Sequence, residues 1–105
     1  VPGKSGREAE IVNSMLASGT QVIGASLKHS ILFPNVRIEE GAEVENSLLF
    51  HGVTIAAHAK LQRCIVDKGV SVPSGDQIGF DRKRDSERFT VSDSGIVVIP
   101  KDYRF

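Results

Sequence analysis

Few side chains in this sequence are of the kinds that bind metals or carry out catalysis. The three histidines, His29, His51 and His58, could in principle ligate a metal or serve as the base of an acyltransferase. Their spacing matches no helical or strand pair that would bring them to one ion. We therefore interpret all three as exposed positions on strands or corners, and we predict no catalytic residue and no metal ligand in this chain.

The single cysteine allows two interpretations. Cys64 occupies the same repeat position as Ser14, Ser30 and Ser47, which favours a small side chain packed in a column. A reactive thiol would need an accessible, electropositive setting. Because Arg63 is adjacent, that alternative stays open.

The most unusual position in the sequence is the charged pair Asp67–Lys68. The equivalent corners of the two preceding repeats read Phe33–Pro34 and Phe50–His51, so the third repeat interrupts an apolar column and sets Lys68 directly above His51. A solvated corner is the plain interpretation. The functional one is an anion site with Lys68 as a phosphate ligand, joined by Lys101 and Arg104 if the C-terminal tail folds back.

An internal repeat defines the elements that must position these residues. With a shift of 17 residues, aliphatic or alanine residues fall on one another through three copies, and a fainter copy lies upstream. Each copy contains three short segments. On two sides an apolar residue alternates with any residue, which is typical of short strands, and on the third side two apolar residues are adjacent. The predicted core comprises Ala25, Leu27, Val36, Ile38, Ala42, Val44, Val53, Ile55, Ala59, Leu61, Val70 and Val72.

Three strands per copy predict a triangular coil, and stacked coils predict an all-β, parallel β-helix of about four coils over residues 11–78. The residue before each strand is often Gly, Asn or Ser, as at Gly24, Ser30, Asn35, Gly41, Ser47, Gly52 and Gly69. Gly and Asn enter left-handed backbone conformations at low cost, as sharp corners require.

The repeat ends near residue 78, and residues 79–105 form a different segment. The charge run at residues 81–88 fits either a helical turn or a solvated loop. Two β-rich runs then flank Ser92–Gly95, which predicts a β-hairpin. We expect this tail to fold over the open end of the β-helix as a cap, because an uncovered end is an exposed sheet edge.

Composition excludes several classes of partner. The 13 basic residues balance the 13 acidic ones, so no net positive field is available for nucleic acid. No apolar run is long enough to cross a membrane.

The chain's single cysteine suits a reducing compartment, so we expect a cytoplasmic protein. Residues 1–10 have the composition of a linker and predict a preceding domain.

Four segments resemble the C-terminal domain of bacterial ADP-glucose pyrophosphorylase (glucose-1-phosphate adenylyltransferase). They are Val12–Met15, Ser30–Pro34, Ile65–Gly69 and, most specifically, Arg88–Val98. The resemblance extends from about Gly6 to Tyr103. Together with a general similarity to hexapeptide-repeat proteins, it implies left-handed winding of the coils.

The resemblance also implies a function. In that family an N-terminal domain makes ADP-glucose and pyrophosphate from ATP and glucose 1-phosphate with Mg²⁺, so this chain itself would hold no cofactor. The β-helix domain contributes to a homotetramer and to allosteric control by phosphorylated metabolites. Lys68 and Lys101 match basic effector contacts of the family. A further basic contact would fall at Phe105, where this sequence departs, and Arg104 is the candidate replacement.

The alternative function is a stand-alone trimeric hexapeptide-repeat enzyme, either an acyltransferase or a metal-dependent enzyme. Such acyltransferases usually extrude a long loop from one coil, whereas residues 25–72 run without an insertion. The histidines do not converge either. Both observations favour a regulatory and oligomerisation module over an enzyme.

Overall fold

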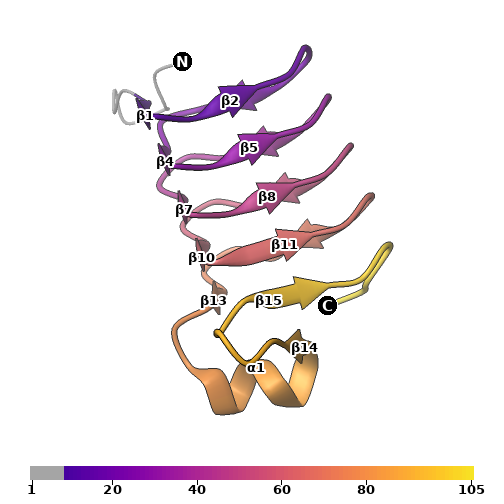
Figure 1. Ribbon diagram of the computed structural model, residues 1–105. Coiled ribbons are helices and arrows are strands. Elements are labelled where there is room, and N and C mark those ends of the chain that lie inside the picture. Colours follow the sequence, from indigo (N-terminus) through magenta and orange to yellow (C-terminus); the bar gives the residue numbers. More distant parts are fainter. Residues whose placement is uncertain (1–8) are drawn as a thin grey trace.

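The computed structural model describes residues 9–105 and shows a stack of three-sided coils wound as a left-handed parallel β-helix (Figure 1). This confirms the predicted fold class. Most of the predicted linker, residues 1–8, lies outside the described residues, and the first strand begins at Glu10. No helix in the described part of the chain is long and apolar enough to cross a membrane.

Each side of the β-helix is one sheet, and its strands are parallel except for β14 at the edge of the second sheet. The first sheet contains β1 (Glu10–Val12), β4 (Ser26–Lys28), β7 (Glu43–Glu45), β10 (Lys60–Gln62) and β13 (Gln77–Ile78). The second contains β2 (Met15–Leu16), β5 (Ile31–Leu32), β8 (Leu48–Leu49), β11 (Cys64–Val66), β15 (Val97–Ile99) and β14 (Thr90–Val91). The third contains β3 (Gln21–Val22), β6 (Arg37–Ile38), β9 (Thr54–Ile55) and β12 (Ser71–Val72).

Strand register follows the sequence repeat. Leu27 pairs with Val44, and Val44 with Leu61, which is the shift of 17 residues. The upstream copy pairs Met15 with Ile31, which is the shift of 16. All twelve predicted core residues are buried, with no more than 3% of any of them exposed.

Left-handed backbone conformations make the corners, as predicted for the glycines and Asn35. Gly24, Gly41, Gly52 and Gly69 all have positive φ. The serine positions differ from the expectation, because on that side the residue before the serine turns the chain. His29 and Asn46 take positive φ there, next to Ser30 and Ser47.

The serines have another role, which is to join coils. The Ser14 hydroxyl accepts the Ser30 amide at 3.1 Å, the Ser30 hydroxyl accepts the Ser47 amide at 3.1 Å, and the Ser47 hydroxyl accepts the Cys64 amide at 3.2 Å. Each of these hydroxyls also donates to the carbonyl two residues earlier. A ladder of side-chain hydrogen bonds therefore runs along one edge of the β-helix.

The tail closes one end, as predicted. The charge run forms the helix α1 (Arg82–Arg88), with Asp81 as its N-cap accepting the Arg84 amide. β14 then pairs antiparallel with β15, which confirms the hairpin. β15 also pairs parallel with β11, so the tail extends the second sheet by one coil while α1 lies beyond it (Figure 1).

Candidate functional site

Lys68 and Lys101 occupy stacked corners of consecutive coils. Val66 pairs with Ile99, so Lys68, two residues after Val66, has the same register as Lys101, two residues after Ile99. The amide of the following residue, Asp102, donates to the Lys68 carbonyl at 3.0 Å. The register therefore sets Lys101 directly over Lys68. Both side chains are exposed, and within residues 9–105 neither ammonium group forms an ion pair. We call this pair the lysine corner.

Asp67 interrupts the aromatic column as the sequence indicated. Phe33 and Phe50 stack with ring centroids 4.9 Å apart, and the next coil presents Asp67 at that position. Its carboxylate accepts the backbone amide of Lys68 at 2.7 Å. The carboxylate thus binds a backbone amide within its own turn, and among the ion pairs of residues 9–105 none joins it to the Lys68 ammonium group.

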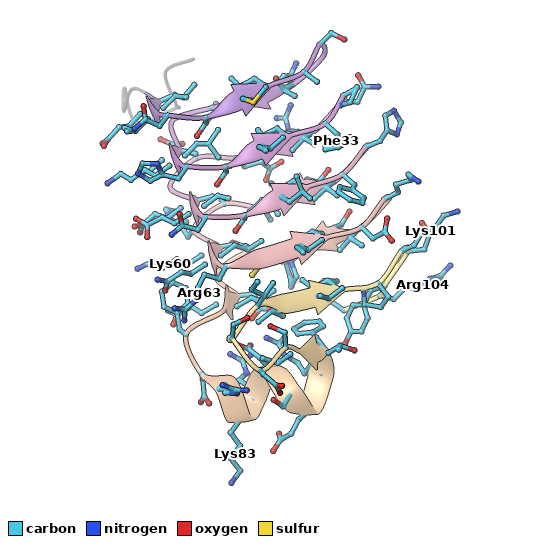
Figure 2. All side chains as sticks on the ribbon, viewed as in Figure 1. Phe33, Lys60, Arg63, Lys83, Lys101 and Arg104 are labelled. Carbon is cyan, nitrogen blue, oxygen red and sulfur yellow. The ribbon has the colours of Figure 1, made fainter. Side chains whose placement is uncertain are left out.

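Arg104 lies on the neighbouring side of the same corner. Arg104 lines a groove of about 750 Å³ along the third sheet, together with Glu39, Ser71 and Asp102. Neither lysine of the lysine corner lines this groove. Figure 2 shows Lys101 and Arg104 at the end of the chain's last coil, with Lys101 pointing away from the β-helix. The structure thus brings Lys68 and Lys101 together and sets Arg104 beside them, facing a separate groove.

Phe105 has a structural reason for departing from the family pattern. Its ring lies 4.9 Å from that of Tyr103 and 5.7 Å from that of Phe89. The Arg88 guanidinium sits over Phe89 at 4.8 Å. An aromatic cluster therefore occupies the place where a basic residue was expected, and it anchors the tail.

The other candidates are structural. All three histidines are exposed; His29 and His58 turn corners, while His51 contacts the Asn35 side chain at 3.1 Å. Within residues 9–105 no group of three or more His, Cys, Asp or Glu residues could hold a metal ion. Cys64 is 1% exposed, and burial raises the pKa of its thiol to about 12, so the reactive-thiol interpretation is wrong.

The sequence did not reveal the groove beside Arg104. It forms only because the tail returns to the third sheet, and neither the repeat nor any local motif reports that contact. Glu39 and Ser71 belong to different coils and reach the groove as outward positions of that sheet. Strand alternation alone could have marked them as outward, but not as neighbours of the tail.

Comparison with known proteins identifies one matching family and a set of relatives that all carry the name glucose-1-phosphate adenylyltransferase. Residues 1–99 match the family model described as GlmU-like, C-terminal hexapeptide. Over all 105 residues the chain is 55% identical to glucose-1-phosphate adenylyltransferase 2 of Vibrio vulnificus and 49% identical to that of Vibrio parahaemolyticus. It is 44% identical over 101 residues to glucose-1-phosphate adenylyltransferase of Deinococcus deserti. The chain spans about a quarter of the length of these relatives and matches a C-terminal region.

Proposed function

Because this chain belongs to the GlmU-like C-terminal hexapeptide family, we propose that it is the regulatory and assembly module of a glucose-1-phosphate adenylyltransferase. The reaction, ATP plus glucose 1-phosphate to ADP-glucose plus pyrophosphate, would be carried out by residues that precede this chain. Mg²⁺ and ATP would bind there as well. The names of the relatives, and the quarter of their length that the chain spans, support this proposal over a stand-alone acyltransferase.

The lysine corner is the observation that carries the regulatory part of the proposal. Two ammonium groups that form no ion pair within residues 9–105 project from backbone that the ladder between β11 and β15 holds in register. A phosphate ester carries up to two negative charges and three acceptor oxygens, which suits two such donors. Each charged hydrogen bond is worth about 1.5–3 kcal/mol.

The position of the lysine corner also offers a means of coupling. Lys68 belongs to the repeat, whereas Lys101 follows β15 in the tail. A phosphate held by both would tie the tail to the body of the β-helix. Binding would then favour one arrangement of the tail, and any domain that contacts the tail would respond to the effector.

The first test is the activity of the full-length protein and of this chain, measured as pyrophosphate release from ATP and glucose 1-phosphate. We expect release by the full-length protein, none by residues 1–105 alone, and a changed rate when phosphate esters or inorganic phosphate are added. A full-length protein without this activity would overturn the assignment of the parent enzyme. An active protein whose rate ignores every phosphate compound would overturn the regulatory role.

Assembly is the third part of the proposal, and we expect a homotetramer. Light scattering of the full-length protein measures its mass directly. A monomer at micromolar concentration would contradict the assembly role and leave the activity assignment untouched.

A further inference from the structure

A pocket of about 190 Å³ lies where the tail meets the corner between β10 and β11. Segments far apart in the chain form its walls. They contribute Arg63 from that corner, Phe80 after β13, Arg82 and Asp85 from α1, and Ser94 from the turn of the hairpin. Figure 2 shows Arg63 on the side of the β-helix where the loop from β13 leads into α1. The pocket shares no residue with the lysine corner or with the groove along the third sheet, so it is a separate site.

Asp85 brings to this pocket a hydrogen-bond acceptor that has no partner. The residue is 1% exposed, and its Oδ2 accepts the Gly79 amide at 2.9 Å. Its Oδ1 is buried and has no hydrogen-bond partner within residues 9–105. A buried carboxylate oxygen without a donor is costly, so such atoms normally meet a protein group, a water molecule or a ligand. A molecule in the pocket that donates a hydrogen bond would therefore satisfy Oδ1.

Two arginines bring donors to the same pocket. Arg82 lines it while donating to the Ser92 carbonyl at 3.1 Å, a contact that orients its guanidinium beside the hairpin turn. Arg63 forms no ion pair within residues 9–105. Its φ is 52°, and the equivalent corners of earlier coils include Asn13 and Asn46, whose residue type adopts positive φ more readily. The turn alone therefore does not explain an arginine at this corner.

We propose that this pocket binds inorganic phosphate that carries a proton. The P–OH group would donate to Asp85 Oδ1, while the guanidinium groups of Arg63 and Arg82 would donate to the unprotonated oxygens. The planar set of donors on arginine suits the oxygens of a phosphate. At about 30 Å³ per water molecule, the pocket has room for roughly six waters, which is enough for an ion of this size.

The buried carboxylate would make the site selective. Sulfate has nearly the same shape, but it carries no proton at neutral pH, so its oxygens would face the Asp85 carboxylate without a hydrogen bond between them. Phosphate monoesters also lack this proton for the most part, because their second pKa is about 6. Repulsion of this kind is a general means of rejecting a wrong ligand. The pocket would therefore take inorganic phosphate, whereas the lysine corner suits phosphate esters.

Hydrogen exchange of the full-length protein tests the proposal at residues 79–96, which include α1 and the hairpin turn. Inorganic phosphate should slow exchange there, because the bound ion would join the corner at Arg63 to the cap. Sulfate at the same ionic strength should not. No protection by phosphate, or equal protection by sulfate, would overturn the inference. The measurement needs no enzymatic activity, so its outcome is separate from that of the proposed function.

Substitution of Arg63 localises the effect. Arg63→Ala should raise the phosphate concentration that gives half of the protection by at least about tenfold, as loss of one charged hydrogen bond predicts. Lys83→Ala is the matched control, because Lys83 is an exposed cation of α1 that does not line the pocket. Lys83→Ala and Lys68→Ala should both leave that concentration unchanged, which separates the pocket from the lysine corner. An unchanged phosphate dependence in Arg63→Ala would contradict the proposal.

Asp85→Asn tests the selectivity. Asparagine keeps an oxygen for the Gly79 amide and offers its NH₂ group to the pocket in place of Oδ1. Sulfate should then protect residues 79–96 as phosphate does. Continued rejection of sulfate by the folded variant would refute the role of the carboxylate. If the cap of Asp85→Asn does not form, Arg63→Ala still decides whether phosphate binds in this pocket.

Discussion

At the residue scale, position on the coil decides whether a reactive side chain can take part in chemistry. Cys64 points inward, donates from its thiol to the Gln62 carbonyl at 3.3 Å and is enclosed by the core. Lys68, four residues later, stands on a corner and is exposed. The strand β11 therefore begins with a buried thiol and leads into a corner that carries an exposed ammonium group.

The burial of Cys64 predicts a dependence of stability on pH. Desolvation raises the pKa of the thiol from 9.0 to about 12. The unfolded chain would lose this proton from about pH 9, while the folded chain would keep it until about pH 12. The unfolded state then binds fewer protons, so stability should fall as pH rises between these values and should be unaffected below them.

The measurement compares the native chain with Cys64→Ser, which retains the small polar side chain of the serine column. Urea unfolding between pH 8 and 11 should show a steeper loss of stability for the native chain. The difference isolates the thiol, because lysines and the tyrosine titrate in both proteins. Parallel curves would contradict the assignment of a buried, protonated thiol.

At the element scale, the cap depends on one carboxylate. The Asp76 side chain is 8% exposed and pairs with Arg88 at 3.0 Å and with Arg84 at 3.5 Å. Asp76 precedes β13, whereas both arginines belong to α1. The carboxylate therefore attaches the cap to the last coil, and its hydrogen bond raises the pKa of Arg88.

Asp76→Asn should loosen the cap without unfolding the repeat. Loss of a charged hydrogen bond to a half-buried guanidinium costs about 1.5–3 kcal/mol, so hydrogen exchange of the β15 amides should accelerate by roughly 10- to 150-fold. The exposed Asp93→Asn provides the control. Unchanged exchange in β15 would mean that the aromatic cluster of Phe89, Tyr103 and Phe105 alone holds the tail.

The repeat could be predicted from the sequence because inward positions recur at fixed spacing. The core residues, the glycine corners and the hairpin all follow from local patterns. The groove that Arg104 lines together with residues of the third sheet, and the pairing of Asp76 with α1, could not be predicted, because both depend on how a non-repetitive tail returns. The same holds for His29 and Asn46 as corner residues, since the serines beside them were the more regular feature.

At the scale of the whole molecule, the β-helix has two unlike ends. One end is closed by its own tail and holds the lysine corner at its edge, while the other exposes core residues. The proposed regulatory role uses this arrangement, because the lysine corner joins the tail to the coils.

The most direct test of the account is the response of full-length Lys68→Ala to phosphorylated effectors. Pyrophosphate release is measured against the concentration of each active phosphate ester, with Lys83→Ala as the control, because Lys83 is an exposed lysine on α1 (Figure 2). We expect Lys68→Ala to keep its basal rate and to need roughly 10- to 150-fold more effector, as loss of one charged hydrogen bond predicts. Lys83→Ala should match the native protein. An unchanged effector concentration dependence in Lys68→Ala would contradict the account and leave Lys68 as a solvated corner.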